Sequence, residues 1–516
     1  MKKNFEIYYT SDVHGSIFPV DYAGGREKRC GILNYAAEIV KTGNTLVLDG
    51  GDSLQGTPLL SYYLEHREDF PYQPMAEAFG EAGLDCFTLG NHDFNFGYAP
   101  LRDYVCALQE KGTDCVCANV RDLRGGLPLL PYVIRTLENG LRIGITGLVT
   151  DSVKVWEDPA HLVDLEITDP LEKAEEMLRI LRGQCDVTVC IYHGGYEEEL
   201  ESGRRLSESK ENVACALARR CSFDLLLTGH QHMAIEGRRL YGSYTVQPAA
   251  NLEHYFHIFG EAELAGGTRT ALILRSQRKP LGTKHGADCF RRLSELETRT
   301  EAWLSETIGR LPAALPPEDK LEIALHGSRV AALFNQIQLL ETGADFSCTG
   351  LGNAPIGLPR ELSIRSIYTA YPFANTIIVK EVTRESLRAA LERCAMYLEL
   401  DGEGKPRFSD AFMKPKVEHY NYDFYAGLDY AFDLRKPAGE RVVRLRRLDG
   451  TELQSGNVYR LALSNYRATG TGGYPMLGAA REVYSGADNV QDLLIAYIRR
   501  AGELSIPENY RFSVRY

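Results

Sequence analysis

Residues 5–15, FEIYYTSDVHG, join an apolar run to a loop that carries an aspartate and a histidine. The other apolar runs of the first half lie at 45–48, 86–89, 115–118, 143–148, 187–192 and 225–228. Each ends in a small polar loop and is followed by a helix-like segment. Strand–loop–helix alternation predicts an α/β domain, in which ligand-binding residues gather on loops at the carboxyl ends of the strands.

Side chains with metal-binding chemistry occupy five of these strand ends. A single aspartate there usually caps a helix, and a single histidine is more often a satisfied surface or core residue. Five such ends together indicate a metal or catalytic site. Carboxylate, amide oxygen and imidazole without thiolate suit manganese, iron, zinc, cobalt or nickel. The motifs are Asp12-Val13-His14, Asp49-Gly50-Gly51-Asp52, Gly90-Asn91-His92-Asp93, Tyr192-His193 and Gly229-His230-Gln231-His232.

In this order the motifs resemble the signature of the calcineurin-like metallophosphoesterases: DxH, GDxx, GNHD or GNHE, a later histidine, and GHxH. The resemblance implies two divalent metal ions. It places Asp12, His14 and His232 on one ion and Asn91, His193 and His230 on the other, with Asp52 bridging them. A metal pair lowers the pKa of a shared water to about neutrality. The expected chemistry is therefore in-line attack of a metal-bridging hydroxide on phosphorus.

His92 follows a ligand but is not a ligand in the family pattern. Its position suits it to meet the oxyanion that develops in the transition state, or to protonate the leaving oxygen. The alternative is that His92 only fixes the orientation of Asn91 by a hydrogen bond.

The chain is long enough for more than one domain, and its pattern changes twice. We expect a catalytic domain at 1–275, a linker at 276–319 and a second domain at 320–516. The linker carries an amphipathic stretch at 288–308, predicted to be a long helix, and then prolines that end it. The resulting fold class is a metallophosphoesterase β-sandwich flanked by helices, joined by a linker helix to a smaller mixed α+β domain.

In the second half, strand-like segments lie at 376–380 and 459–464, with a helix between them that has Leu387, Leu391, Cys394 and Leu398 on one face. Residues 371–376, YPFANT, and 465–475, NYRATGTGGYP, resemble the bacterial 5′-nucleotidase family. The resemblance implies that Phe373 and Tyr466 sandwich a nucleobase and that Asn375 bonds the base or the ribose. The alternative for both rings is ordinary core packing.

Three features favour the 2′,3′-cyclic-nucleotide 2′-phosphodiesterase/3′-nucleotidase branch of that family. Residues 420–430, YNYDFYAGLDY, resemble the YNFD block of that branch. Asn95 stands where 5′-nucleotidases typically have an aspartate that pairs with the histidine, and 350–357 lacks the arginine of their GGxxR block. Gly472 departs from both branches, which often have an aspartate there.

The leading hypothesis is a dinuclear-metal nucleotide phosphohydrolase that acts on 2′,3′-cyclic nucleotides and 3′-nucleotides. The first alternative is a 5′-nucleotidase or nucleotide-sugar hydrolase. The second, from a different class, is a nucleotide-binding protein with a lapsed active site. A phosphoprotein phosphatase would use the same metals but would leave the second domain unexplained.

The composition limits which kinds of partner and which compartment we expect for this protein. With 44% hydrophobic and 25% charged residues and no apolar run of membrane-spanning length, we expect a globular protein without a membrane segment. A net charge of −12 argues against binding polymeric nucleic acid, so the expected partner is a small-molecule nucleotide. Twelve scattered cysteines without a CxxC pair predict buried thiols rather than disulfides. Together with a start that lacks a signal-like apolar stretch, they favour the cytoplasm.

Overall fold

The computed structural model describes residues 1–516 except 23, 206–209, 374 and 415. The chain divides into two compact units, Met1–Thr300 and Glu301–Tyr516. The division falls within helix α8 (Ala287–Leu304), inside the stretch predicted to be a linker. The amphipathic pattern extends beyond the helix, because Ile308 belongs to strand β18 (Thr307–Arg310).

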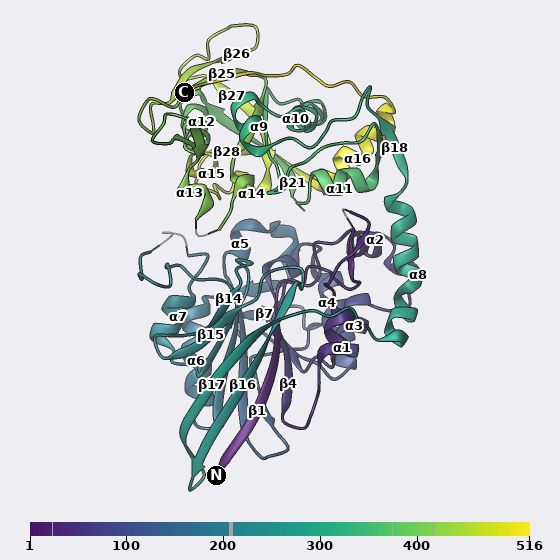
Figure 1. The fold of residues 1–516 in the computed structure, drawn as a ribbon, viewed down its shortest axis with the longest axis vertical. Helices are drawn as coiled ribbons and strands as arrows, with labels where there is room; N and C mark the ends of the chain where they lie inside the picture. Colours follow the sequence, from purple (N-terminus) through teal and green to yellow (C-terminus); the bar gives the residue numbers. More distant parts are fainter. Residues whose placement is uncertain (23, 206–209, 374, 415) are drawn as a thin grey trace. The chain divides into compact units, whose positions relative to one another are not determined.

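Two sheets form the centre of the first unit (Figure 1). In the seven-stranded sheet, β1 pairs in parallel with β4 and antiparallel with β16, and the parallel order continues through β5, β6 and β8. The sheet order is β17 (Thr268–Pro280), β16 (His254–Ala265), β1 (Lys2–Thr10), β4 (Thr45–Asp49), β5 (Cys86–Phe87), β6 (Asp114–Val116) and β8 (Leu129–Leu130).

The six-stranded sheet has a parallel centre of β10, β12, β13 and β15, with antiparallel strands at both edges. Its order is β14 (Ile235–Leu240), β15 (Ser243–Gln247), β13 (Leu225–Thr228), β12 (Val187–His193), β10 (Arg142–Val149) and β9 (Tyr132–Thr136). One buried apolar cluster takes side chains from both sheets, including Ile7, Leu48, Ile145 and Val189. The predicted β-sandwich is therefore confirmed.

Helices cover the outer faces of this sandwich. On the six-stranded sheet, α6 (Pro170–Leu181) and α7 (Ala214–Arg220) bury Leu178 and Leu217 against Tyr192 and Leu226. On the other side lie α1 (Ile32–Glu38), α3 (Pro74–Ala82) and α4 (Tyr98–Glu110) (Figure 1). Among the described residues, no helix combines the length and apolar character needed to cross a bilayer. All twelve cysteines are free thiols, and ten of them are buried.

The second unit is a mixed α and β domain, as predicted. Its five-stranded sheet has the order β24 (Asp423–Ala426), β19 (Phe346–Gly350), β27 (Val458–Ser464), β21 (Thr376–Thr383) and β28 (Arg481–Asn489). A three-stranded sheet has the order β26 (Val442–Arg447), β25 (Leu428–Asp433) and β29 (Arg511–Arg515). The largest helices are α10 (Arg329–Thr342), α12 (Arg384–Ala395) and α16 (Val490–Ala501).

The helical face predicted for 387–398 is correct only in part. Leu387, Leu391 and Cys394 are buried on α12, but the helix ends at Ala395 and Leu398 belongs to β22 (Leu398–Leu400). A pattern of apolar spacing cannot separate a last helical turn from a buried strand that follows directly.

A buried ion pair lies in the core of the second unit. Arg467 Nε donates to Asp423 Oδ2 at 2.7 Å and its Nη2 donates to Asp423 Oδ1 at 3.1 Å, while both side chains are only 3% exposed. The guanidinium also donates to the carbonyl of Thr471 at 2.6 Å and lies over the ring of Tyr474. Arg467 thus ties β24 to the loop at 465–475.

We expect Arg467→Met to destabilise the second unit by about 3–5 kcal/mol, because Asp423 would keep a buried charge without its partner. Denaturant unfolding of the whole chain measures the shift. Arg435→Met is the control: it removes a similar fork-like pair with Asp433, but Arg435 is 58% exposed, so the expected cost is below about 1 kcal/mol. Equal shifts in the two variants would contradict the structural role of Arg467.

Candidate metal centre

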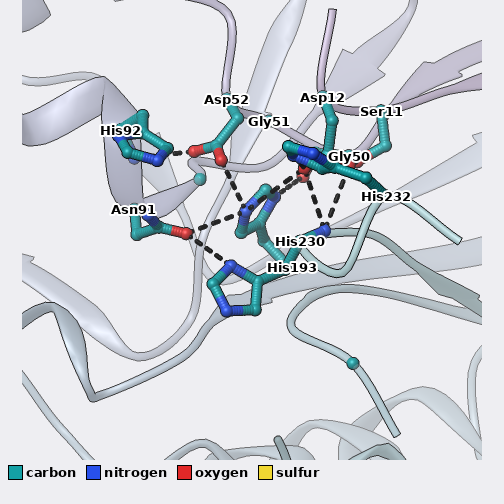
Figure 2. A network of polar contacts seen from close by, with 12 residues as sticks. Ser11, Asp12, Gly50, Gly51, Asp52, Asn91, His92, His193, His230 and His232 are labelled. Carbon is teal, nitrogen blue, oxygen red and sulfur yellow. Dashed lines mark hydrogen bonds and ion pairs between the residues drawn. The ribbon is translucent and has the colours of Figure 1, made fainter. Parts of the chain in front are cut away.

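The predicted ligands come together at one edge of the sandwich (Figure 2). Asp12 and His14 follow β1, Asp52 follows β4, and Asn91 opens the short helix η2 (Asn91–Phe94) after β5. In the other sheet His193 is the last residue of β12, while His230 and His232 follow β13. Because these strands run parallel within their sheets, their carboxyl ends deliver the side chains to the same edge.

The backbone at this edge is held in an unusual conformation. The described part of the chain has eight non-glycine residues with positive φ, and five of them are predicted ligands. They are Asp12 (54°), His14 (48°), Asp52 (60°), His230 (71°) and His232 (57°). Residues other than glycine rarely adopt a positive φ. Those that do concentrate at functional sites, where the surrounding fold compensates the strain.

The first group of ligand atoms comes from Asp12, His14 and His232, all within 4.8 Å of one another. His232 Nε2 lies 3.0 Å from His14 Nε2 and 3.3 Å from Asp12 Oδ1. His14 Nδ1 lies 2.9 Å from the carbonyl oxygen of Gln55, which can only accept. His14 therefore carries its proton on Nδ1 and directs the lone pair of Nε2 into the group.

The second group is formed by Asp52, His193 and His230. Asn91 belongs with it, because its Oδ1 lies 3.2 Å from His193 Nε2 and 2.8 Å from His230 Nδ1. Asp52 Oδ2 lies 3.1 Å from His193 Nε2, and Asp12 Oδ1 of the first group is 4.0 Å from the same nitrogen. The two groups are thus adjacent, and His193 lies between Asp52 and Asp12.

Outer hydrogen bonds orient these ligands, and sequence patterns did not indicate them. His193 Nδ1 lies 2.6 Å from the carbonyl of Gly50, and His230 Nε2 lies 2.9 Å from Glu211 Oε1. Asp93 accepts from the backbone N–H groups of Asp52, Ser53, Leu54 and Gly90 at 2.8–3.0 Å. Asp93 stands in a recognisable motif, whereas Glu211 lies in a loop without any motif. Only the folded chain brings Glu211 to His230.

Burial and mutual charge set the protonation of the site. Burial and the neighbouring His232 lower the pKa of His14 to about 4, so its imidazole is neutral at pH 7. Burial opposes protonation of His193, but Asp52 beside it outweighs this effect and raises its pKa to about 10. Burial also works against ionisation of Asp12, yet His232 and His193 lower its pKa. A cation bound here would displace the His193 proton.

The residues present fit a pair of divalent cations. Asp52 Oδ2 is buried, and it faces His193 Nε2 at 3.1 Å. His14 Nε2, which carries a lone pair, lies 3.0 Å from His232 Nε2. A cation between such atoms satisfies both arrangements, and oxygen plus imidazole donors suit divalent transition metals.

His92 lies beside the first group, with its ring centre 5.6 Å from that of His14. Its Nδ1 lies 2.7 Å from Asn95 Oδ1, and its backbone N–H donates to Asp52 Oδ1 at 2.6 Å. Within the described residues, the His92 ring bonds the side chain of Asn95 and not that of Asn91. The orientation of the imidazole therefore depends on Asn95.

The predicted base-binding rings belong to the second unit. Phe373 and Tyr466 both lie near Tyr420, whose ring centre is 6.3 Å from that of Phe373 and 6.4 Å from that of Tyr466. All three rings are partly exposed, which distinguishes them from fully buried core residues. Asn375 Nδ2 donates to the hydroxyl of Tyr371 at 3.4 Å. Sequence analysis did not assign Tyr420 to this group.

Local packing accounts for glycine at position 472, where the family often has an aspartate. Gly472 has φ 77°, and a Cβ there would lie 2.3 Å from Asn421 Oδ1 and 2.4 Å from Arg467 Nη1. An aspartate at this position would collide with the network around the buried ion pair. The departure from the family pattern therefore follows from local packing.

Two family models match the chain. The model described as calcineurin-like phosphoesterase matches residues 5–234, and the model described as 5′-nucleotidase, C-terminal domain, matches 308–479. The crystal structure of a putative 5′-nucleotidase from Staphylococcus aureus in complex with alpha-ketoglutarate is similar over the full length of both chains, with a TM-score of 0.89 and 27% identity.

Curated relatives are similar over almost the whole chain. A 2′,3′-cyclic-nucleotide 2′-phosphodiesterase/3′-nucleotidase of Haemophilus influenzae is 24% identical over 97% of this chain and 85% of its own length. The trifunctional nucleotide phosphoesterase protein YfkN of Bacillus subtilis is 23% identical over 96% of this chain. This chain spans only 38% of the length of that second relative.

Proposed function

Because the chain belongs to the 5′-nucleotidase family, with a calcineurin-like phosphoesterase domain followed by a 5′-nucleotidase C-terminal domain, we propose that it hydrolyses nucleotides with two divalent metal ions. The proposed substrates are 2′,3′-cyclic nucleotides and 3′-nucleotides. The observation that carries the proposal is the adjacency of the two ligand groups around Asp12, Asp52 and His193.

Asp12, His14 and His232 would hold one ion and Asn91, His193 and His230 the other, with Asp52 shared. When bound, such a pair neutralises phosphate charge and supplies an activated water as the nucleophile. The remaining tasks fall to the chain itself. His14 and His193 are oriented by the carbonyls of Gln55 and Gly50. Asn95 accepts from His92 Nδ1, which leaves Nε2 of that ring for the phosphate. His92 can then stabilise developing charge or deliver a proton to the leaving oxygen.

The choice of substrate rests on two kinds of support. Asn95 lies three residues after His92, where the 5′-nucleotidase pattern typically has an aspartate. The segment around Tyr420 resembles the cyclic-nucleotide branch. Relatives with that activity in their names cover nearly all of this chain. A 5′-nucleotidase or nucleotide-sugar hydrolase would share the metal centre but differ in these segments.

One assay panel tests the proposal. Metal-free protein is reloaded with manganese, cobalt, nickel or zinc and assayed with 2′,3′-cyclic AMP, 3′-AMP, 5′-AMP and a nucleotide sugar. We expect turnover of the first two substrates and two metal ions per chain by elemental analysis. Preference for 5′-AMP would favour the alternative enzyme, whereas nucleotide binding without turnover by the metal-loaded protein would favour the lapsed binding protein.

Base recognition gives a separate prediction. Stacking on one aromatic ring is worth about 1–3 kcal/mol, so Phe373→Ala or Tyr466→Ala should raise KM for nucleotides about 5- to 150-fold. Hydrolysis of bis(p-nitrophenyl) phosphate, which has no nucleobase, should hardly change. Tyr484→Ala is the matched control, since Tyr484 is an exposed ring on β28 of the same unit. Equal losses on both substrates would contradict a base clamp.

A further inference from the structure

A continuous row of hydrogen bonds leads away from His92. His92 Nδ1 lies 2.7 Å from Asn95 Oδ1, and Asn95 Nδ2 donates to Glu157 Oε2 at 2.7 Å. The other carboxylate oxygen, Glu157 Oε1, lies 2.8 Å from His161 Nδ1. Glu157 belongs to none of the motifs that predicted the site.

The carboxylate of Glu157 is held firmly. Its side chain is only 7% exposed, and the backbone N–H of Asp158 also donates to Oε1 at 2.9 Å. Glu157 ends helix α5 (Val153–Trp156). His161 in turn packs against Gly97, where an added Cβ would lie 3.2 Å from the imidazole. Contacts from both sides therefore fix this segment beside the loop that carries Asn95.

The chemistry of the three groups imposes a direction on the row. A carboxylate can only accept, so Asn95 must present its NH₂ to Glu157 and its oxygen to His92. The oxygen of an amide can only accept, so His92 must carry a proton on Nδ1. Nε2 is then the nitrogen left for the reacting phosphate. Without Glu157, the Asn95 amide could rotate and offer a donor to Nδ1, which would reverse the tautomer of His92.

We propose that Glu157 is a positioning residue for His92, acting through the Asn95 amide. The inference rests on the proposed function, since it concerns how His92 is prepared for phosphoester hydrolysis. In the 5′-nucleotidase pattern an aspartate at position 95 would contact the histidine directly. In this chain the negative charge belongs to Glu157, which contacts Asn95 instead of His92. The Asn95 amide, held by Glu157, then orients the His92 ring.

Two variants test the role. Glu157→Gln keeps the shape but lets the side chain donate as well as accept, and Glu157→Leu removes the acceptor. Loss of such an outer partner typically lowers activity about 10- to 100-fold, so we expect kcat for 3′-AMP to fall in this range, more for leucine than for glutamine. KM and metal content should stay unchanged. Bis(p-nitrophenyl) phosphate should be affected less, because p-nitrophenolate leaves without a proton.

The control and the rescue separate positioning from a structural role. Glu166→Gln makes the same change at an exposed ion pair with Arg121 and should leave kcat unchanged. Adding Asn95→Asp to Glu157→Gln returns a carboxylate to His92 and should restore most of the kcat. Failure of this rescue, or equal losses on both substrates together with loss of metal, would overturn the proposal.

A measurement independent of turnover completes the test. Nitrogen NMR of ¹⁵N-histidine-labelled protein, with the His92 signal identified by its absence in His92→Ala, reports which ring nitrogen carries the proton. We expect the Nδ1–H form in the wild type and a shift toward Nε2–H in Glu157→Leu. An unchanged tautomer would overturn the inference even if the enzyme is active. An inactive wild type with the expected tautomer change would instead count against the proposed function alone.

Discussion

Asp52→Asn is expected to remove nearly all activity, by on the order of 10³-fold or more, because one side chain serves both proposed metal positions. Asp52 is 1% exposed, its Oδ2 lies 3.1 Å from His193 Nε2, and its Oδ1 accepts from the backbone N–H of His92 at 2.6 Å. The substitution to asparagine removes the negative charge. It also replaces one of the two ligand oxygens by an NH₂ group, which cannot bind a cation. Elemental analysis should show loss of metal from both positions.

A matched control lies three residues earlier. Burial raises the pKa of Asp49 to about 8, so this carboxyl group is largely neutral at pH 7. In Asp49→Asn the amide oxygen can still accept from Gly51, and its NH₂ group can face Thr10, which bonds the second carboxyl oxygen of Asp49. Metal content and kcat should therefore change little. If Asp52→Asn kept two metal ions and normal turnover, the assignment of the shared ligand would be wrong.

His92→Ala should lower kcat on the order of 10²-fold or more while leaving metal content intact, as expected for loss of a general acid or of an oxyanion donor. The structure supports a role distinct from that of the ligands, because the His92 ring bonds Asn95 and lies 5.6 Å from the ring of His14. Steady-state kinetics with 3′-AMP and elemental analysis measure the two properties separately.

His66→Ala serves as the comparison, since His66 ends helix α2 (Pro58–Glu65) and bonds the carbonyl of Tyr62. Its kcat and metal content should match those of the wild type. A metal loss in His92→Ala as large as that in Asp52→Asn would show instead that His92 maintains the geometry of the ligands.

The sequence by itself determined the sandwich class, the two-domain family and the set of side chains that meet at the candidate metal centre. Its strongest signals were continuous apolar runs followed directly by Asp, Asn or His, because parallel strands buried on both faces are apolar and end at a common edge. The hairpin of β16 and β17 did not appear among these runs. Its residues alternate between buried and exposed, and this weaker pattern resembles many loops and helices.

The tertiary structure alone decided how the ligands are oriented. Gln55, Gly50 and Glu211 fix the ring nitrogens of His14, His193 and His230, and Glu157 reaches His92 through Asn95. Two of these partners are backbone carbonyls, and the other two, Glu211 and Glu157, are acids outside every motif. They lie 19 to 143 positions along the chain from the groups that they bond. A ligand's chemical type is written in its own residue, whereas its tautomer and direction depend on the neighbour that folding places beside it.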